Sequence, residues 1–209
     1  MTVSETIPDN SNLKTGRTGA RTLSQRFPVW LCDVWGVVHD GETAFQGACQ
    51  ALSAHRKAGG TVILITNAPR PSTAILPQLA DIKVPEDCYD AFVSSGDVTR
   101  RLVSLEEGRN VYHLGPDKDL TLIEGMPVNF TGLDEAEVVL CSGLMDDETE
   151  VPEDYRPMLK AMHDRDLPMI CANPDQVVRK GKRLLPCGGA LATIYNELGG
   201  SVAMAGKPY

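Results

Sequence analysis

Two polar segments that could take part in chemistry directly follow apolar runs. Asp33 comes after the apolar residues 29–32, and Thr66 and Asn67 come after the β-branched residues 61–65. Short apolar runs bounded by turn residues are typical of buried strands in a parallel sheet. Open α/β sheets bind ligands at the carboxyl ends of such strands, so this placement predicts ligand-binding side chains. The alternative for Asp33 is an aspartate that only caps its strand.

The segment between these two runs has the pattern of a helix. Apolar residues recur at helical spacing over residues 48–58, and Gly59-Gly60 follows as a C-terminal stop signal. Strand, helix and strand in succession form a βαβ unit, in which the strands are parallel and the crossover is right-handed. Asp33 and Thr66 should therefore lie on the same edge of one sheet.

The alternation of strands and helices continues along the chain, so we predict an α/β fold. Further strand-like runs lie at residues 91–94, 110–114, 128–130, 138–141, 169–171 and 201–205. Asn173-Pro174-Asp175 and Gly206-Lys207-Pro208 follow the last two of these runs. The basic residues 179–183 either line an anion site or, as we favour, form an exposed hairpin. The acidic residues 146–148 either bind a metal or, as we favour, form a solvated loop.

Composition limits the classes of protein to which the chain can belong. Hydrophobic residues make up 42% of its 209 residues, which is enough for a packed core. The formal net charge of −8 argues against a nucleic-acid binder, which needs lysine and arginine at phosphates. There is no apolar run of the ~18 residues that a membrane span needs, and residues 1–20 do not resemble a signal peptide. The six cysteines form no C-x-x-C pair, which predicts reduced thiols. We expect a cytoplasmic protein with no nucleic-acid or membrane partner.

The four polar segments, in their order and spacing, resemble the motifs of the haloacid dehalogenase-like (HAD) superfamily. The resemblance covers residues 28–209 and is to class IIA, the branch of pyridoxal phosphatases and nucleotide or sugar phosphatase-like proteins. It implies a Rossmann-like core with a parallel sheet over residues 25–95 and 199–209. Residues 96–198 would form an inserted α/β cap, and residues 1–24 a flexible N-terminal tail.

The resemblance also implies catalytic roles. Asp33 would be the nucleophile that attacks phosphorus and forms an aspartyl-phosphate. Thr66 would hydrogen-bond a phosphate oxygen, and Asn67 would shape the loop around it. Lys207 would pair with both the nucleophile and the phosphoryl group. The implied substrate is a small phosphorylated metabolite, and the resemblance allows a homodimer.

A magnesium ion and a mobile cap belong to the same implied scheme. Mg²⁺ would bind Asp33, the backbone carbonyl of Trp35 and a later carboxylate. Gly36 would lie at the substrate in the same loop. Asn173-Pro174-Asp175 would be the cap residues that face the substrate, and closure of the cap would exclude water and set specificity.

Two features depart from the family pattern. The family motif Asp-x-Asp-Gly is replaced by Asp33-Val34-Trp35-Gly36, so the second aspartate, which protonates the leaving group, is missing. General acid–base catalysis is worth ~10²–10⁴-fold, so slow turnover of alkyl phosphates is expected. The acidic metal-binding motif that follows the lysine in the family is also missing, which predicts a chain lacking the last part of its core.

These departures leave three functions open. The first is a Mg²⁺-dependent phosphatase in which His39, Asp40 or Asp175 supplies the proton, with His39 as the first residue to test. The second is a hydrolase of the same fold whose leaving group needs no proton, such as a halide or an acyl phosphate. The third is a catalytically degenerate protein that binds phosphorylated ligands. We rank the phosphatase first because Asp33, Thr66 and Lys207 are all present.

Overall fold

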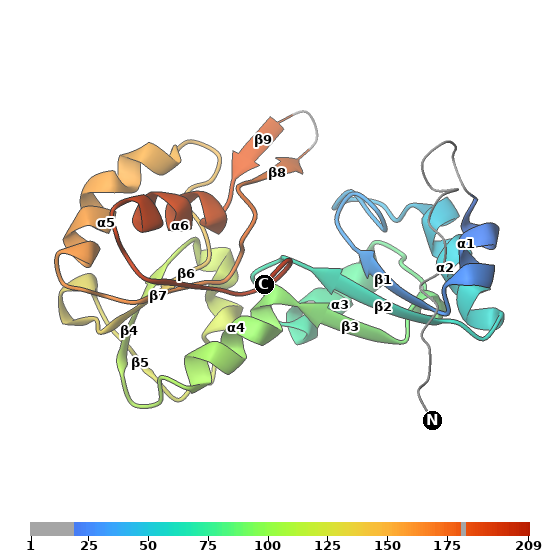
Figure 1. The fold of residues 1–209 in the computed structure, drawn as a ribbon, viewed down its shortest axis with the longest axis horizontal. Coiled ribbons are helices and arrows are strands. Elements are labelled where there is room, and N and C mark those ends of the chain that lie inside the picture. The colour runs from blue at the N-terminus through green and yellow to red at the C-terminus, as the bar shows by residue number, and fades with distance from the viewer. Residues whose placement is uncertain (1–18, 181–182) are drawn as a thin grey trace, which may run out of the picture.

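The structure is a computed structural model that describes residues 19–180 and 183–209, and it has two lobes, each built on a parallel sheet (Figure 1). The strands are β1 (Val29–Asp33), β2 (Thr61–Thr66), β3 (Ala91–Ser94), β4 (Asn110–Leu114), β5 (Asn129–Phe130), β6 (Val138–Cys141), β7 (Met169–Cys171), β8 (Val177–Lys180), β9 (Arg183–Pro186) and β10 (Val202–Met204). The α-helices are α1 (Ala20–Arg26), α2 (Gln46–Lys57), α3 (Ser72–Asp81), α4 (Ser95–Ser104), α5 (Arg156–His163) and α6 (Gly188–Glu197). Short 3₁₀ helices include η3 (Asp117–Leu122). The predicted α/β class is confirmed.

The first lobe contains a parallel sheet with the order β1-β2-β3 in the described residues. Helices α2 and α3 cover one face of it, where Leu52 and Leu79 pack with Val62 and Leu64 of β2. In the register of the strands, Asp33 lies beside Ile65, and Thr66 lies beside Ser94. The predicted βαβ unit therefore exists, and it brings the ends of β1 and β2 to the same edge of the sheet.

The second lobe contains a larger parallel sheet with the order β10-β7-β6-β4-β5 in the described residues. Helices α5 and α6 cover one face, where Leu159 and Leu191 pack with Val139. The other face packs against α4 and η3 through Val103 and Leu122. The cores on both faces explain why strands such as β6 are apolar throughout, because neither face meets solvent.

Strand β10 differs from the prediction, which grouped residues 199–209 with the first lobe. It pairs in parallel with β7 of the second lobe, with Val202 beside Met169 and Met204 beside Cys171. The reason is the path of the chain: β7, α6 and β10 form a strand–helix–strand unit, which returns to the neighbouring position of the same sheet. The residues after β10 then turn back toward the first lobe.

Other predictions can be compared directly with the structure. Arg179 and Lys180 lie in β8 and Arg183 lies in β9, and these two strands pair antiparallel, as expected for a hairpin; residues 181–182 lie outside the described residues. All six cysteines are free, as predicted. The predicted tail falls largely on residues 1–18, which lie outside the described residues, and α1 begins at Ala20. Within the described residues, no helix has the length and apolar character needed to cross a membrane.

Candidate active site

Asp33 and Lys207 form an ion pair between the end of β1 and the segment that follows β10. Lys207 Nζ donates to Asp33 Oδ1 at 2.5 Å and to the carbonyl of Ile65 at 3.3 Å. The Asp33 side chain is 47% exposed and the Lys207 side chain is 35% exposed, and both residues line a cleft. In the described residues no hydrogen bond reaches Asp33 Oδ2, so this oxygen is available to a ligand or to act as a nucleophile.

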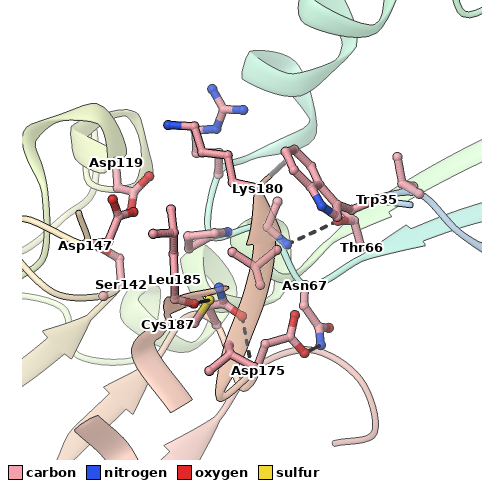
Figure 2. A pocket seen from close by; sticks show the side chains of 18 of the residues that line it. Trp35, Thr66, Asn67, Asp119, Ser142, Asp147, Asp175, Lys180, Leu185 and Cys187 are labelled. Carbon is pink, nitrogen blue, oxygen red and sulfur yellow. Dashed lines mark hydrogen bonds between the residues drawn. The ribbon is translucent and has the colours of Figure 1, made fainter. Parts of the chain in front are cut away.

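Asn67 connects the first lobe to two segments of the second. Its side-chain amide donates to Asp175 Oδ1 at 2.8 Å and to the carbonyl of Lys207 at 3.1 Å, and its oxygen accepts from the Lys207 amide at 2.7 Å. Figure 2 shows Asn67 and Asp175 meeting below the cleft. Asn67 is buried, so these bonds are shielded from water and fix the position of Lys207.

Gly206 is required for this arrangement. Its φ of +103° is in the left-handed region, and a Cβ there would lie 2.7 Å from the Asn67 side-chain oxygen and 2.9 Å from Ser95 Oγ. Only glycine meets both conditions without strain. The turn that returns Lys207 to Asp33 therefore depends on this residue type.

Thr66 lies beside this pair at the end of β2. It is buried, and its Oγ1 accepts from the Ala68 amide at 3.2 Å. This bond uses the oxygen as an acceptor and leaves the hydroxyl hydrogen to donate. A threonine in this state can donate a hydrogen bond to an anionic oxygen in the cleft.

Trp35 joins the loop after β1 to the β8–β9 hairpin. Its indole Nε1 donates to the carbonyl of Arg179 at 3.0 Å, and its ring meets that of His39 edge to face at 5.5 Å. A Cβ at Gly41 would lie 2.7 Å from the Trp35 ring, so the ring packs directly on that glycine. Trp35 stands at the sequence position of the missing acid and forms a contact between the lobes instead.

His39 lines the cleft, as its candidate role requires. It is buried, and this desolvation lowers its pKa, although the neighbouring Asp40 raises it by a smaller amount. Its Nδ1 accepts from the Gly41 amide at 2.9 Å, which places the proton of the neutral ring on Nε2. The neutral ring can donate a hydrogen bond but is a weak proton donor.

Asp40 is not among the residues that line the cleft. Its carboxylate accepts from the Thr43 and Glu42 amides, and these bonds lower its pKa. It is therefore an ionised acceptor that closes its own turn. The alternative in which Asp40 supplies a proton has no support in this geometry.

The cleft has a volume of about 810 Å³ and is lined by both lobes. Asn173 and Asp175 line it, as predicted for cap residues. Pro174 and Gly36 do not: Pro174 packs beside Gly206 and Gly189, and Gly36 forms a turn with a φ of +76°. Their predicted contact with the substrate therefore has no counterpart in the lining of the cleft.

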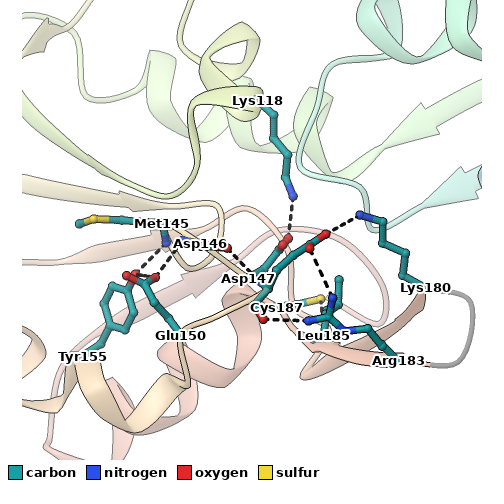
Figure 3. Close-up of polar contacts among 11 residues, drawn as sticks. Lys118, Met145, Asp146, Asp147, Glu150, Tyr155, Lys180, Arg183, Leu185 and Cys187 are labelled. Atoms are coloured by element: carbon teal, nitrogen blue, oxygen red, sulfur yellow. Dashed lines mark hydrogen bonds and ion pairs between the residues drawn. The ribbon is translucent and has the colours of Figure 1, made fainter.

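The second lobe adds lining residues that we did not predict. They are Lys118, Asp119, Ser142, Asp147 and Cys187. Ser142 directly follows the apolar run of β6, just as Asp33 follows the apolar residues 29–32, so the rule used for Asp33 would have found it. Asp119 lies in η3 and has no such signal. Asp147 falls in the acidic loop expected to be solvated, but it pairs with Lys118 at 2.6 Å at the edge of the cleft (Figure 3).

Oxygen atoms near Asp33 suit a hard cation. Asp33 Oδ2 and the backbone carbonyl of Trp35 come from the same loop, and Mg²⁺ is bound in proteins through one or two carboxylates together with waters and substrate phosphates. Within residues 19–180 and 183–209, no group of three or more His, Cys, Asp or Glu side chains is placed to hold a metal. Asp33 and the Trp35 carbonyl therefore offer two oxygen ligands of the kind that Mg²⁺ binds, which is part of a site.

Asp119 should make stability depend on pH. Burial raises its pKa to about 6, against smaller opposing effects of Ser142, Lys118 and Arg70. Below pH ~4 both the folded and unfolded chains are protonated here, so stability is unaffected; between pH ~4 and ~6 the unfolded chain loses its proton first, so stability falls. Above pH ~6 the ionised, buried group destabilises the fold by about 3 kcal/mol.

We therefore expect Asp119→Asn to raise the free energy of unfolding at pH 7.5 by up to about 3 kcal/mol and to leave it nearly unchanged at pH 4. Urea unfolding at the two pH values measures this difference. Asp134→Asn, at an exposed position of the same lobe, is the matched control. An equal effect of Asp119→Asn at both pH values would contradict the assignment.

Comparisons with known proteins identify the family of this chain. A family model described as haloacid dehalogenase-like hydrolase matches residues 30–128. The crystal structure of a hydrolase of the haloacid dehalogenase-like family from Brucella suis 1330 is 47% identical, with a TM-score of 0.86; the match covers 91% of this chain and 72% of that chain. A search among curated protein sequences finds no match.

More distant structures share the fold. A glycerol phosphate phosphatase from Mycobacterium tuberculosis, solved with calcium, is 22% identical over 89% of this chain and 55% of its own, with a TM-score of 0.64. NagD from E. coli K-12 is 21% identical over 87% of this chain and 70% of its own, with a TM-score of 0.61. The chain thus spans 55–72% of the length of these three proteins.

Proposed function

Because this chain belongs to the haloacid dehalogenase-like family of hydrolases, as its motifs predict, we propose that it is a phosphatase of small phosphorylated metabolites. The observation that carries the proposal is the pairing of Asp33 with Lys207 at 2.5 Å in a cleft lined by both lobes. The fold that the chain shares with NagD and with the glycerol phosphate phosphatase supports its placement in class IIA.

The first chemical step uses Asp33 as the nucleophile. Its Oδ2 attacks phosphorus, a new oxygen–phosphorus bond forms, and the bond to the ester oxygen breaks. Lys207 holds Oδ1 and places a positive charge beside the phosphoryl group, and the hydroxyl of Thr66 donates to one of its oxygens. Water then hydrolyses the aspartyl-phosphate, which releases phosphate and restores Asp33.

A divalent cation is the proposed cofactor, and we infer Mg²⁺. The glycerol phosphate phosphatase from Mycobacterium tuberculosis has also been solved in complex with magnesium. Asp33 and the carbonyl of Trp35 would hold the ion, which when bound neutralises negative charge on the phosphoryl oxygens. The ion would also keep Asp33 and a dianionic phosphate from repelling each other.

The second lobe acts as the cap in this proposal. Its hydrogen bonds with the first lobe, Asn67–Asp175 and Trp35–Arg179, link the two walls of the cleft, and we expect the cleft to close over a bound substrate. A closed cleft excludes water while the nucleophile attacks and strengthens the electrostatic interactions inside it. The cytoplasmic location and the homodimer stay predictions.

The presence of Trp35 affects which leaving groups the protein can release. An alkoxide must receive a proton, and Trp35 provides no acid for that step. The pKa of His39 is lowered by burial, which favours its neutral form, and a neutral imidazole is a weak proton donor. We therefore expect aryl and acyl phosphates, whose leaving groups are stable as anions, to react faster than alkyl phosphates. This same observation favours the second candidate function, a hydrolase whose natural substrate has a leaving group that needs no proton.

Phosphate release from a panel of alkyl, aryl and acyl phosphates tests the proposal. We expect release in the presence of Mg²⁺ and a loss of at least about a hundredfold after the metal is removed by a chelator, because the charge on the phosphoryl group is then no longer neutralised. Restoring Mg²⁺ should restore the rate. Absence of release from every ester at saturating Mg²⁺ would reject the phosphatase and leave the ligand-binding alternative.

A further inference from the structure

The wall of the cleft opposite Trp35 and Thr66 carries a carboxylate that the proposed chemistry does not use (Figure 2). Asp119 and Asp147 lie together on the second lobe, across the cleft from Trp35 and Thr66 (Figure 2). Asp119 is only 4% exposed, yet it lines the cleft. Burying a carboxylate costs free energy unless a hydrogen-bond donor pairs with it.

Four carboxylates line the described part of the cleft, and they differ in their partners. Asp33 pairs with Lys207, Asp147 with Lys118, and Asp175 accepts from Asn67. Asp119 makes no ion pair in the described residues, and the neighbouring Ser142 hydroxyl lowers its pKa by less than burial raises it. Asp119 therefore keeps acceptor capacity for a donor that enters the cleft.

The neighbours of Asp119 hold it in place. His113 Nε2 lies 2.9 Å from Ser142 Oγ, and burial lowers the pKa of His113, so the neutral ring can donate to Ser142. The Ser142 hydroxyl is then free to donate to Asp119. A Cβ at Gly115 would lie 2.0 Å from Ser142 Oγ, so glycine is needed for His113 and Ser142 to approach. His113 and Gly115 thus fix the position of Ser142, whose hydroxyl acts on Asp119.

We propose that Asp119 is a specificity-determining residue that accepts hydrogen bonds from a hydroxyl or ammonium group at the end of the substrate remote from its phosphate. The proposal rests on the proposed function, since it assigns the two ends of one ligand to the two walls of the cleft. The phosphate lies at Asp33 and Lys207, and the donor lies at Asp119. The substrate class is thus a small phosphorylated compound that carries an amino or hydroxyl group remote from its phosphate.

The physical reason for such selectivity is the cost of an unpaired acceptor. A ligand that ends in a methyl group displaces water from Asp119 and gives it no donor, whereas a hydroxyl or ammonium group restores the lost hydrogen bond. Sites built to hydrogen-bond a ligand group discriminate strongly against analogues that lack it. We expect a preference of at least about tenfold for the donor-bearing ligands.

Binding of matched alkyl phosphates provides the test. The ligands form a series of graded chain length that ends in methyl, hydroxyl or ammonium, and their Kd values are measured by calorimetry on the Asp33→Asn protein, which needs no turnover. We expect the hydroxyl and ammonium esters of the best-fitting length to bind at least tenfold more tightly than the methyl ester. In Asp33→Asn/Asp119→Leu this ratio should fall to about one.

Two further variants separate recognition from folding. Asp119→Asn keeps the shape of the side chain and an acceptor oxygen, so it should retain preference for the hydroxyl ester but lose that for the ammonium ester. Asp134→Leu, at an exposed position of the same lobe, should leave all ratios unchanged. Equal Kd values for the methyl and donor-bearing esters, or a ratio unaffected by Asp119→Leu, would overturn the proposal.

The pH dependence gives an independent readout. The groups that interact electrostatically with Asp119 are Ser142, Lys118, Arg70, Asp147 and Cys141, and burial raises its pKa to about 6. The preference for the ammonium ester over the methyl ester should therefore decline as the pH falls below ~6, because the carboxylate becomes neutral. Titration of the phosphate cancels in this ratio. Failure of the wild-type protein to release phosphate from any ester would reject the phosphatase alone, whereas the binding ratios decide the role of Asp119.

Discussion

Asp33→Asn should abolish phosphate release, with a loss of about 10³-fold or more relative to the wild-type chain. The amide has no negative charge and cannot form the aspartyl-phosphate. The side chain keeps its size, and its ion pair with Lys207 is roughly half exposed. Surface pairs of this kind contribute 0 to about 1 kcal/mol, so the thermal midpoint should change little. The expected result is a folded, inactive protein.

The measurement is phosphate release at saturating substrate and Mg²⁺, together with thermal unfolding of both proteins. Asp164→Asn is a matched control because it removes an acid from another exposed pair, Lys160–Asp164, outside the cleft. It should leave the rate unchanged. Turnover by Asp33→Asn at a rate close to wild type would show that another residue attacks phosphorus and would reject the proposed mechanism.

Trp35→Asp should accelerate the hydrolysis of alkyl phosphates by about 10²–10⁴-fold, the usual effect of a general acid. The substitution places a carboxyl group two residues after Asp33, where the family motif has its second aspartate. It also removes the hydrogen bond from Trp35 to the carbonyl of Arg179, which reduces the gain by the cost of about 1 kcal/mol for one contact between the lobes. Esters with good leaving groups should show little acceleration.

Trp35→Asn is the matched control, because it removes the same ring and the same indole N–H and adds a side chain of similar size without an acid. The comparison of kcat for one alkyl and one aryl phosphate in the two variants isolates proton transfer. If the two variants hydrolyse the alkyl ester equally fast, a missing acid does not limit the reaction. His39→Gln would then show whether the histidine already supplies the proton.

The local pattern of the sequence determined the elements that carry the nucleophile. Apolar runs with a helical segment between them predicted a βαβ unit, and the register of β1 and β2 places Asp33 and Thr66 at one edge of the sheet. This prediction succeeds because strand periodicity, glycine stops and right-handed crossovers are properties of short segments.

The pairing of Lys207 with Asp33 was predicted from the family resemblance and not from the local sequence pattern. Its contact with Asp33 spans 174 positions of sequence, and no periodicity in the chain points to it. Proximity depends on the turn at Gly206, on the bonds of Asn67 and on the pairing of β10 with β7 in the second lobe. The predicted membership of that strand was wrong because its partner is selected by the path of the chain through α6.

The tertiary structure alone decided how the two walls of the cleft face each other. In the sequence, Trp35 only marks the absence of an acid, but in the structure its indole N–H donates a hydrogen bond to the carbonyl of Arg179 in β8. In the sequence, Asp119 is one polar residue in an irregular segment, but folding buries it in the wall of the cleft and raises its pKa to about 6. Sequence patterns report which residues share an element; burial and electrostatics depend on which elements meet, and the packing of the two lobes sets both.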